Sequence, residues 1–123
     1  MQKVLACAVI TGWMVMLAGT GWADMGKTPP ALKAAPGSKA EAHLKEGIEH
    51  YDQGHYDVAL KHFMAGVKED PQSAEAHYDV ALALDKTQDH KAATEHFKKA
   101  ADLGKNNPEI ANSGILKAHL KMK

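Results

Sequence analysis

The chain of 123 residues contains no arginine, so all 15 of its basic residues are lysine. It therefore lacks the planar guanidinium group that binds carboxylate or phosphate at two points. The lysines are balanced by 15 acidic residues, which gives a formal net charge of zero. A neutral chain has no overall positive field to hold nucleic acid, whose binding rests on cationic contacts to phosphate. We therefore expect neither a dedicated phosphate site nor a nucleic-acid partner.

Catalytic motifs are also missing from the sequence. It has no Gly-rich phosphate loop and no His-Glu-x-x-His pattern, and its one cysteine is Cys7. Serine is scarce: Ser38 and Ser73 stand at expected helix starts, and Ser113 lies in the last expected helix. These serines are explained as caps or surface residues. We therefore expect a protein that is not an enzyme and that carries no cofactor.

The first 23 residues have the layout of a secretory signal peptide. Lys3 precedes an uninterrupted apolar run, Val4 to Ala18, and small residues stand at Gly21 and Ala23. We predict that residues 1–23 are removed after export to the periplasm, which leaves no stable membrane insertion. The mature chain then has no thiol and no disulfide.

An alternative for the same region is a membrane anchor that stays uncleaved. Residues 4–23 make up 20 positions, about the length that crosses a bilayer. Residues 24–37, which follow, are rich in Pro, Gly and Ala without any period. We interpret them as a flexible linker to the first folded element.

The word "AEAH" occurs at residues 40–43 and returns 34 positions later, at residues 74–77. In this register Ala59 matches Ala93, and His62 and Phe63 match His96 and Phe97. Self-similarity at a fixed period of this length indicates a stacked structural repeat. We therefore define two copies, residues 40–73 and residues 74–107.

Each copy is expected to form two helices. In the first copy Ser38 and Glu41 have the spacing of a capping box, and apolar residues follow at helical intervals. Gly54 suits a left-handed helix end, and Pro71 ends the second helix. The pattern predicts a tight helical hairpin.

These residues resemble the tetratricopeptide repeat (TPR) family, whose unit has 34 residues. The resemblance rests on small residues at Gly47, Ala59 and Gly66, on Tyr56 and Phe63, and on their counterparts in the second copy. It implies an all-α fold, a right-handed stack of antiparallel helical hairpins. The TPR domain would cover residues 38–123.

A further helix is expected over residues 108–122, with Asn107 as its cap and Pro108 in its first turn. It would close the stack as a capping helix. Two repeats and a cap are near the lower limit of stability for this architecture, so a homodimer formed through an open end is a further expectation.

The resemblance also implies the function, a non-enzymatic protein–protein interaction module that acts as a scaffold or assembly factor of the cell envelope. In this family the first helix of each hairpin forms a concave wall that binds a peptide or helix. The positions implied as partner-binding are Glu41, Leu44, Ile48, Tyr51, Glu75, Tyr78, Leu82, Asp85, Asn112 and Leu116, together with Glu109 and His119.

A second interpretation of the apolar positions stays open. Leu44, Ile48 and Tyr51 are also the residue types that pack against a neighbouring repeat or against the linker. The TPR branch that binds chaperone carboxyl termini uses Lys and Asn on this wall, so that ligand is not expected.

The histidines offer an alternative function, that of a periplasmic metal-binding or carrier protein. His43, Glu46 and His50 fall at spacings of three and four, on one side of the first expected helix. Imidazole and carboxylate at such spacings can share a Zn or Cu ion. The opposing interpretation is that these histidines are structural or solvated.

Overall fold

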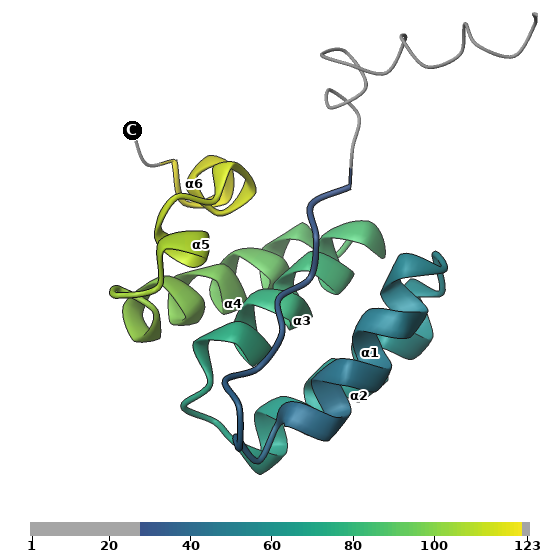
Figure 1. Ribbon diagram of the computed structural model, residues 1–123. Helices are drawn as coiled ribbons and strands as arrows, with labels where there is room; N and C mark the ends of the chain where they lie inside the picture. Colours follow the sequence, from purple (N-terminus) through teal and green to yellow (C-terminus); the bar gives the residue numbers. More distant parts are fainter. Residues whose placement is uncertain (1–27, 122–123) are drawn as a thin grey trace, which may run out of the picture.

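The computed structural model describes residues 28–121 as an all-α fold of helices packed in antiparallel pairs (Figure 1). The predicted signal peptide, residues 1–23, and the first residues of the expected linker lie outside this range. The helices are α1 (Glu41–Asp52), α2 (Tyr56–Glu69), α3 (Ala74–Lys86), α4 (His90–Leu103), α5 (Pro108–Ala111) and α6 (Gly114–Leu120).

The helices stack in chain order. α1 pairs with α2 and α3 pairs with α4, while α2 packs on α3 and α6 packs on α4. This order is what two repeated hairpins and a cap require, because each hairpin buries its apolar face on the next one. The prediction of an all-α stack of helical hairpins is confirmed.

Small and aromatic side chains set the distance between the helices of a hairpin. Phe63 and Phe97 are fully buried at equivalent places in the two copies. A Cβ atom added at Gly47 would clash with the ring of Phe63, so the absence of a side chain there gives the ring its space. Ala59 and Ala93 are also fully buried, as the repeat predicts.

Among the helices of the two repeats, α3 and α4 begin at capping side chains, whereas α1 and α2 do not. Ser73 accepts a hydrogen bond from the Ala76 N–H, and Asp89 accepts one from the Ala92 N–H. The predicted capping box of Ser38 is wrong, because α1 begins later and its cap residue is Ala40. The Ser38 hydroxyl instead accepts from the Ala40 N–H at 3.1 Å and donates to Asp70 at 2.9 Å.

The C-terminal helix expected over residues 108–122 is two shorter helices in the structure. Asn107 caps α5, as predicted, by accepting from the Glu109 N–H at 2.9 Å. The chain then turns at Asn112, and the Ser113 side chain accepts from the Leu116 N–H to begin α6. A second cap residue so soon after the first allows the chain to change direction and lets α6 lie against α4.

The part of the expected linker that the structure describes is packed rather than free. We call residues 28–37 the N-terminal segment. It has no helix or strand, yet Leu32 is buried among the residues of the core. Figure 1 shows the segment as a dark blue stretch of chain that crosses α3 beside α1. No helix within residues 28–121 is both long and apolar enough to cross a membrane.

Candidate functional site

The N-terminal segment crosses α3 beside α1 (Figure 1) and packs on the core that these helices share; we call this face of α1 and α3 the concave wall, the name that the sequence prediction gives it. Leu32 belongs to the same apolar core as Leu44 of α1 and Leu82 of α3, and it is only 8% exposed. Ala31 and Ala34 are half-buried against that core. The wall therefore binds an extended stretch of its own chain.

A buried carboxyl group fixes the middle of the segment. The Leu32 N–H donates a hydrogen bond of 2.6 Å to Oδ1 of Asp79, which is fully buried on α3. The other oxygen of this carboxyl group has no hydrogen-bond partner within residues 28–121. Burial raises the pKa of Asp79 well above its usual value, and the hydrogen bond from Leu32 opposes this only in part.

Further contacts hold the two ends of the segment. The Tyr51 hydroxyl donates to the carbonyl oxygen of Pro29 at 3.1 Å, and burial raises the pKa of this phenol. The Lys86 ammonium donates to the Thr28 hydroxyl at 3.3 Å, and the Gly37 N–H donates to the Glu41 carboxylate at 2.9 Å. Together with the bond from Leu32 to Asp79, four hydrogen bonds hold the segment. Three of them use backbone groups of the segment and so do not depend on its side chains.

The predicted partner-binding residues of the first repeat differ in how accessible they are. Glu41 is exposed and bonded to the N-terminal segment, whereas Leu44 is fully buried and Tyr51 is 3% exposed. Ile48 is half-buried and lines a hollow of the surface. With the segment in place, Ile48 is the apolar residue of this group that a partner can reach.

In the second repeat most of the predicted positions are also covered. Tyr78 and Leu82 are buried, and the Tyr78 hydroxyl lies 2.8 Å from the Ser113 hydroxyl. Glu75 is half-buried and accepts from the Asn107 amide at 2.9 Å, while Asp85 contacts two histidines.

The predicted positions in the C-terminal region are separated by the turn between α5 and α6. Asn112 is exposed at the end of α5, Leu116 is buried, and Glu109 is exposed. His119 lies at the far end of α6, beside Asp85. Of these predicted positions, Leu116 is buried in the core and His119 makes a polar contact with α3, so they do not form a continuous face.

Two open hollows flank the N-terminal segment. One, of about 450 Å³, lies on the α1 side and is lined by Lys33, Ala34, Pro36, Glu41, Lys45, Ile48 and Glu49. The other, of about 470 Å³, lies on the side of the C-terminal helices and is lined by Pro29, Pro30, Leu32, Tyr78, Glu109, Ser113, Gly114 and Ile115. Both are formed partly by the segment itself, so their shape depends on its position.

The structure does not bring His43, Glu46 and His50 together as a metal site. The Glu46 carboxylate lies 3.2 Å from Nδ1 of His62, and the His50 ring stacks on His62 at 5.4 Å. The three residues that do converge within 28–121 are Asp85, His90 and His119, whose candidate ligand atoms all lie within 4.8 Å of one another.

A family model described as tetratricopeptide repeat matches residues 44–108, just over half of the chain. The chain belongs to the tetratricopeptide repeat family. Domains of this family generally mediate protein–protein interaction and are typically non-catalytic. No curated protein sequence matches the chain.

Two functional features were missed from the sequence alone. Asp79 interrupts an otherwise apolar stretch from Tyr78 to Leu84, and an isolated acid at such a place is a signal that it meets a polar partner. Asp85 and His90 lie five residues apart across a turn, a spacing that no helical ligand motif uses. Their proximity to His119 depends on how α6 packs.

Proposed function

We propose that the protein is a non-enzymatic scaffold or assembly factor of the cell envelope, which binds an extended peptide on its concave wall. The observation that carries this proposal is the position of Leu32, which is buried on the wall while its N–H donates to Asp79. A surface that binds its own extended chain in this way has the chemistry to bind another.

The contacts suit a peptide ligand. Asp79 accepts from a backbone N–H and Tyr51 donates to a backbone carbonyl, so both use groups that are present in every peptide. The side chain of Leu32 supplies a buried apolar contact. Backbone hydrogen bonds combined with a few buried side chains are a common mode of peptide recognition.

The N-terminal segment would compete with such a partner. It is part of the same chain, so its effective concentration at the wall is high, on the order of millimolar for short flexible tethers. A partner must displace the segment or bind in the hollows beside it. Binding of a partner is therefore expected to be weaker in the parent chain than in a variant whose segment has left the wall.

Export to the periplasm is part of the proposal and rests on the layout of residues 1–23. Cleavage after Ala23 leaves the N-terminal segment only a few residues from the new amino terminus. The mass of the protein isolated from the cell envelope tests this point. A chain that begins at Asp24 supports export with cleavage, and a chain that retains residues 4–23 in the membrane supports the anchor instead.

The binding experiment uses a fluorescent peptide of residues 28–37 and measures its anisotropy as the full chain is added. Leu32→Ala should bind this peptide more tightly than the parent, because its own segment is held less well. Lys33→Ala is the matched control, since Lys33 is an exposed neighbour and should leave binding as in the parent. Adding Asp79→Ala to Leu32→Ala should weaken binding again. Equal or absent binding in the parent and Leu32→Ala would contradict the proposal, provided that circular dichroism shows intact helices.

Capture from an envelope extract then addresses the natural partner. Ile48→Lys places a charge in the hollow on the α1 side, where the residue is half-buried. Met64→Lys is the control, because Met64 is 47% exposed on α2, outside the concave wall. A partner retained by the parent and by Met64→Lys but lost by Ile48→Lys uses the wall.

A further inference from the structure

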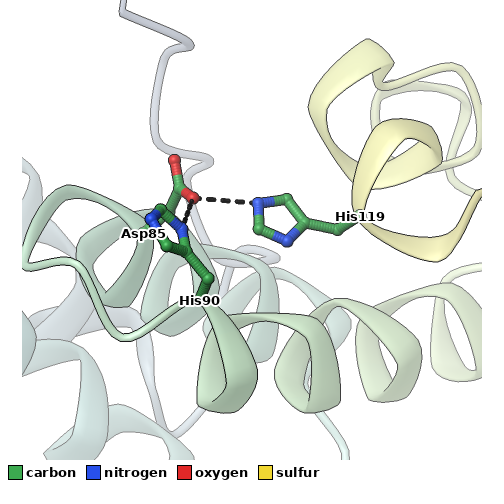
Figure 2. Close-up of side chains that lie close together, drawn as sticks. All are labelled: Asp85, His90 and His119. Carbon is green, nitrogen blue, oxygen red and sulfur yellow. Dashed lines mark hydrogen bonds and ion pairs between the residues drawn. The ribbon is translucent and has the colours of Figure 1, made fainter.

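Asp85, His90 and His119 converge at one end of the concave wall, although they belong to three different helices (Figure 2). The Nδ1 atom of His90 lies 2.8 Å from Oδ1 of Asp85, and Nε2 of His119 lies 2.9 Å from the same oxygen. Within residues 28–121 this is the one group of three such side chains whose ligand atoms lie within 4.8 Å of one another.

Each side chain is positioned by the local structure. Asp85 lies in the last turn of α3 and His90 is the first residue of α4, so the short turn between these helices brings the two together. His119 lies near the end of α6, which packs on α4. Its ring is 4.8 Å from the ring of the buried Phe97, which limits its movement.

The second ring nitrogen of His119 also has a partner. The Thr94 hydroxyl donates to the carbonyl oxygen of His90 at 2.9 Å, so its lone pairs are left to face Nδ1 of His119 at 3.0 Å. This arrangement favours an N–H at Nδ1 and a lone pair at Nε2, the nitrogen that faces Asp85. Hydrogen bonds of this kind orient histidine ligands in metal sites.

An imidazole lone pair and a carboxylate oxygen that face each other at 2.9 Å need a positive charge between them. A proton meets this need if His119 is an imidazolium, and a metal ion meets it as well. Two imidazoles and one carboxylate are a ligand set that divalent transition metals use, with zinc the commonest in three-ligand sites that leave a position open.

We propose that Asp85, His90 and His119 form a binding site for a divalent transition-metal ion, represented by Zn²⁺. The ion takes the place of the protons that join the two rings to the carboxylate, and these protons are released on binding. Access is good, because the side chain of His90 is 60% exposed and that of Asp85 is 21% exposed. The proposal is independent of the peptide-binding function.

Such a site would join the last hairpin to α6. Asp85 and His90 come from the two helices of that hairpin, while His119 comes from the C-terminal region. A ligand that binds only the folded chain raises its stability according to its concentration and affinity. Zn²⁺ is therefore expected to raise the melting temperature and to slow local opening of α6.

The test measures Zn²⁺ binding to the full chain by isothermal titration calorimetry, beside thermal melts with and without the ion. Every sample carries Cys7→Ser, so that the thiol contributes no ligand. The parent is expected to bind one Zn²⁺ and to melt at a higher temperature when it is present. His90→Ala should lower the affinity at least tenfold. Because the His90 side chain is exposed, this variant should keep its helices, which circular dichroism checks.

Two further variants test whether the ion binds here and not at another histidine. His55→Ala removes an exposed histidine that precedes α2 and should bind Zn²⁺ as the parent does. Thr94→Val keeps the shape of the side chain but removes the oxygen that faces His119, and it should lower the affinity about tenfold. No binding by the parent, or equal binding by the parent and His90→Ala, would overturn the proposal. Binding lost in a His43→Ala, His50→Ala variant but kept in His90→Ala would overturn it too.

Discussion

The backbone N–H of Leu32 donates a hydrogen bond of 2.6 Å to the carboxyl group of Asp79, which stands 47 positions later in the chain. Both residues are buried, and the bond joins a segment without regular structure to the middle of α3. It makes the N-terminal segment part of the folded domain. Any partner that uses the concave wall must therefore displace this segment or bind beside it.

The first prediction concerns the contribution of Leu32 to stability. Leu32→Ala should lower the free energy of unfolding by about 1–3 kcal/mol, because it removes most of a buried aliphatic side chain from an otherwise detachable segment. Urea denaturation of the full chain measures the change. Lys33→Ala, at the exposed neighbour, is expected to lie within about 0.5 kcal/mol of the parent. Equal stability of the two variants would show that the segment is not docked in solution.

A second prediction follows from the buried carboxyl group of Asp79. Burial raises its pKa in the folded chain, so the folded state keeps a proton that the unfolded state loses above a pH of about 4. The contribution of Asp79 to the free energy of unfolding is therefore fully present below a pH of about 4. It is lost as the pH rises toward the raised pKa that Asp79 has in the folded chain. The Asp79→Asn side chain does not titrate, and its amide oxygen can still accept the hydrogen bond from the Leu32 N–H.

The melting temperature of Asp79→Asn, minus that of the parent, should therefore increase as the pH is raised from 4. The corresponding slope is at most about 1.4 kcal/mol of unfolding free energy per pH unit. A difference that does not change between pH 4 and pH 8 would contradict a raised pKa for Asp79.

A third prediction concerns the pair of histidines His77 and His96, whose Nδ1 atoms lie 3.1 Å apart. Nε2 of His77 lies 2.9 Å from the carbonyl oxygen of Pro71 and donates to it, so Nδ1 of His77 accepts from His96. Burial, with the neighbouring His77 and Lys99 adding to it, lowers the pKa of His96 to about 4. Burial also lowers the pKa of His77.

The unfolded chain therefore binds more protons than the folded chain between a pH of about 4 and a pH of about 6.5. The stability that this pair contributes is fully present above a pH of about 6.5, the pKa of histidine in the unfolded chain. It is lost as the pH falls from there toward the pKa of about 4 of His96 in the folded chain. His96→Gln can still donate to His77 without titrating, so its stability should depend less on pH in this window. His55→Gln, at an exposed histidine, should keep the dependence of the parent. A slope unchanged by His96→Gln would contradict this account.

The fourth prediction compares the same turn position in the two repeats. Gly54 has a φ of 83° and Gln88 has a φ of 74°, so both adopt the left-handed conformation that ends the first helix of the hairpin. This conformation costs a residue with a Cβ about 1–2 kcal/mol, a cost that glycine does not carry. Gln88→Gly should accordingly stabilise the chain by up to about 1 kcal/mol, and Gly54→Ala should destabilise it by a similar amount.

Chemical denaturation of both variants measures these changes. A Cβ atom added at Gly54 would meet nothing within 4 Å, so a loss of stability there reports on the backbone alone. Opposite signs for the two variants are expected. A gain for Gly54→Ala would show that the turn is not left-handed in solution.

Much of the fold could be predicted because its signals are local and repeated. The word "AEAH" and the matched pairs Ala59 with Ala93 and Phe63 with Phe97 give the period, and the period gives the helical hairpins. Pro108 and Asn107 mark the start of the C-terminal region in the same way. Such features depend on neighbours within a few residues, which a single sequence contains.

Other features depend on distant contacts and left little trace in the sequence. Residues 28–37 are rich in Pro, Gly and Ala, and nothing local indicates that Leu32 meets Asp79. A helix start at Ser113 could not be predicted, because Ile110, Ile115 and Ala118 continue a helical spacing of apolar residues across it. His119 approaches Asp85 only because that cap redirects the chain and lets α6 pack on α4.

Hydrogen exchange of the Leu32 amide is the most direct measurement of whether the concave wall binds an extended peptide. In the parent chain this amide should exchange much more slowly than in an unstructured peptide, because it is buried and donates to Asp79. The amide of Lys33, an exposed residue, provides an internal comparison, and Asp79→Ala should accelerate exchange at Leu32. Exchange of Leu32 at the rate of an unstructured peptide in the parent would contradict the account.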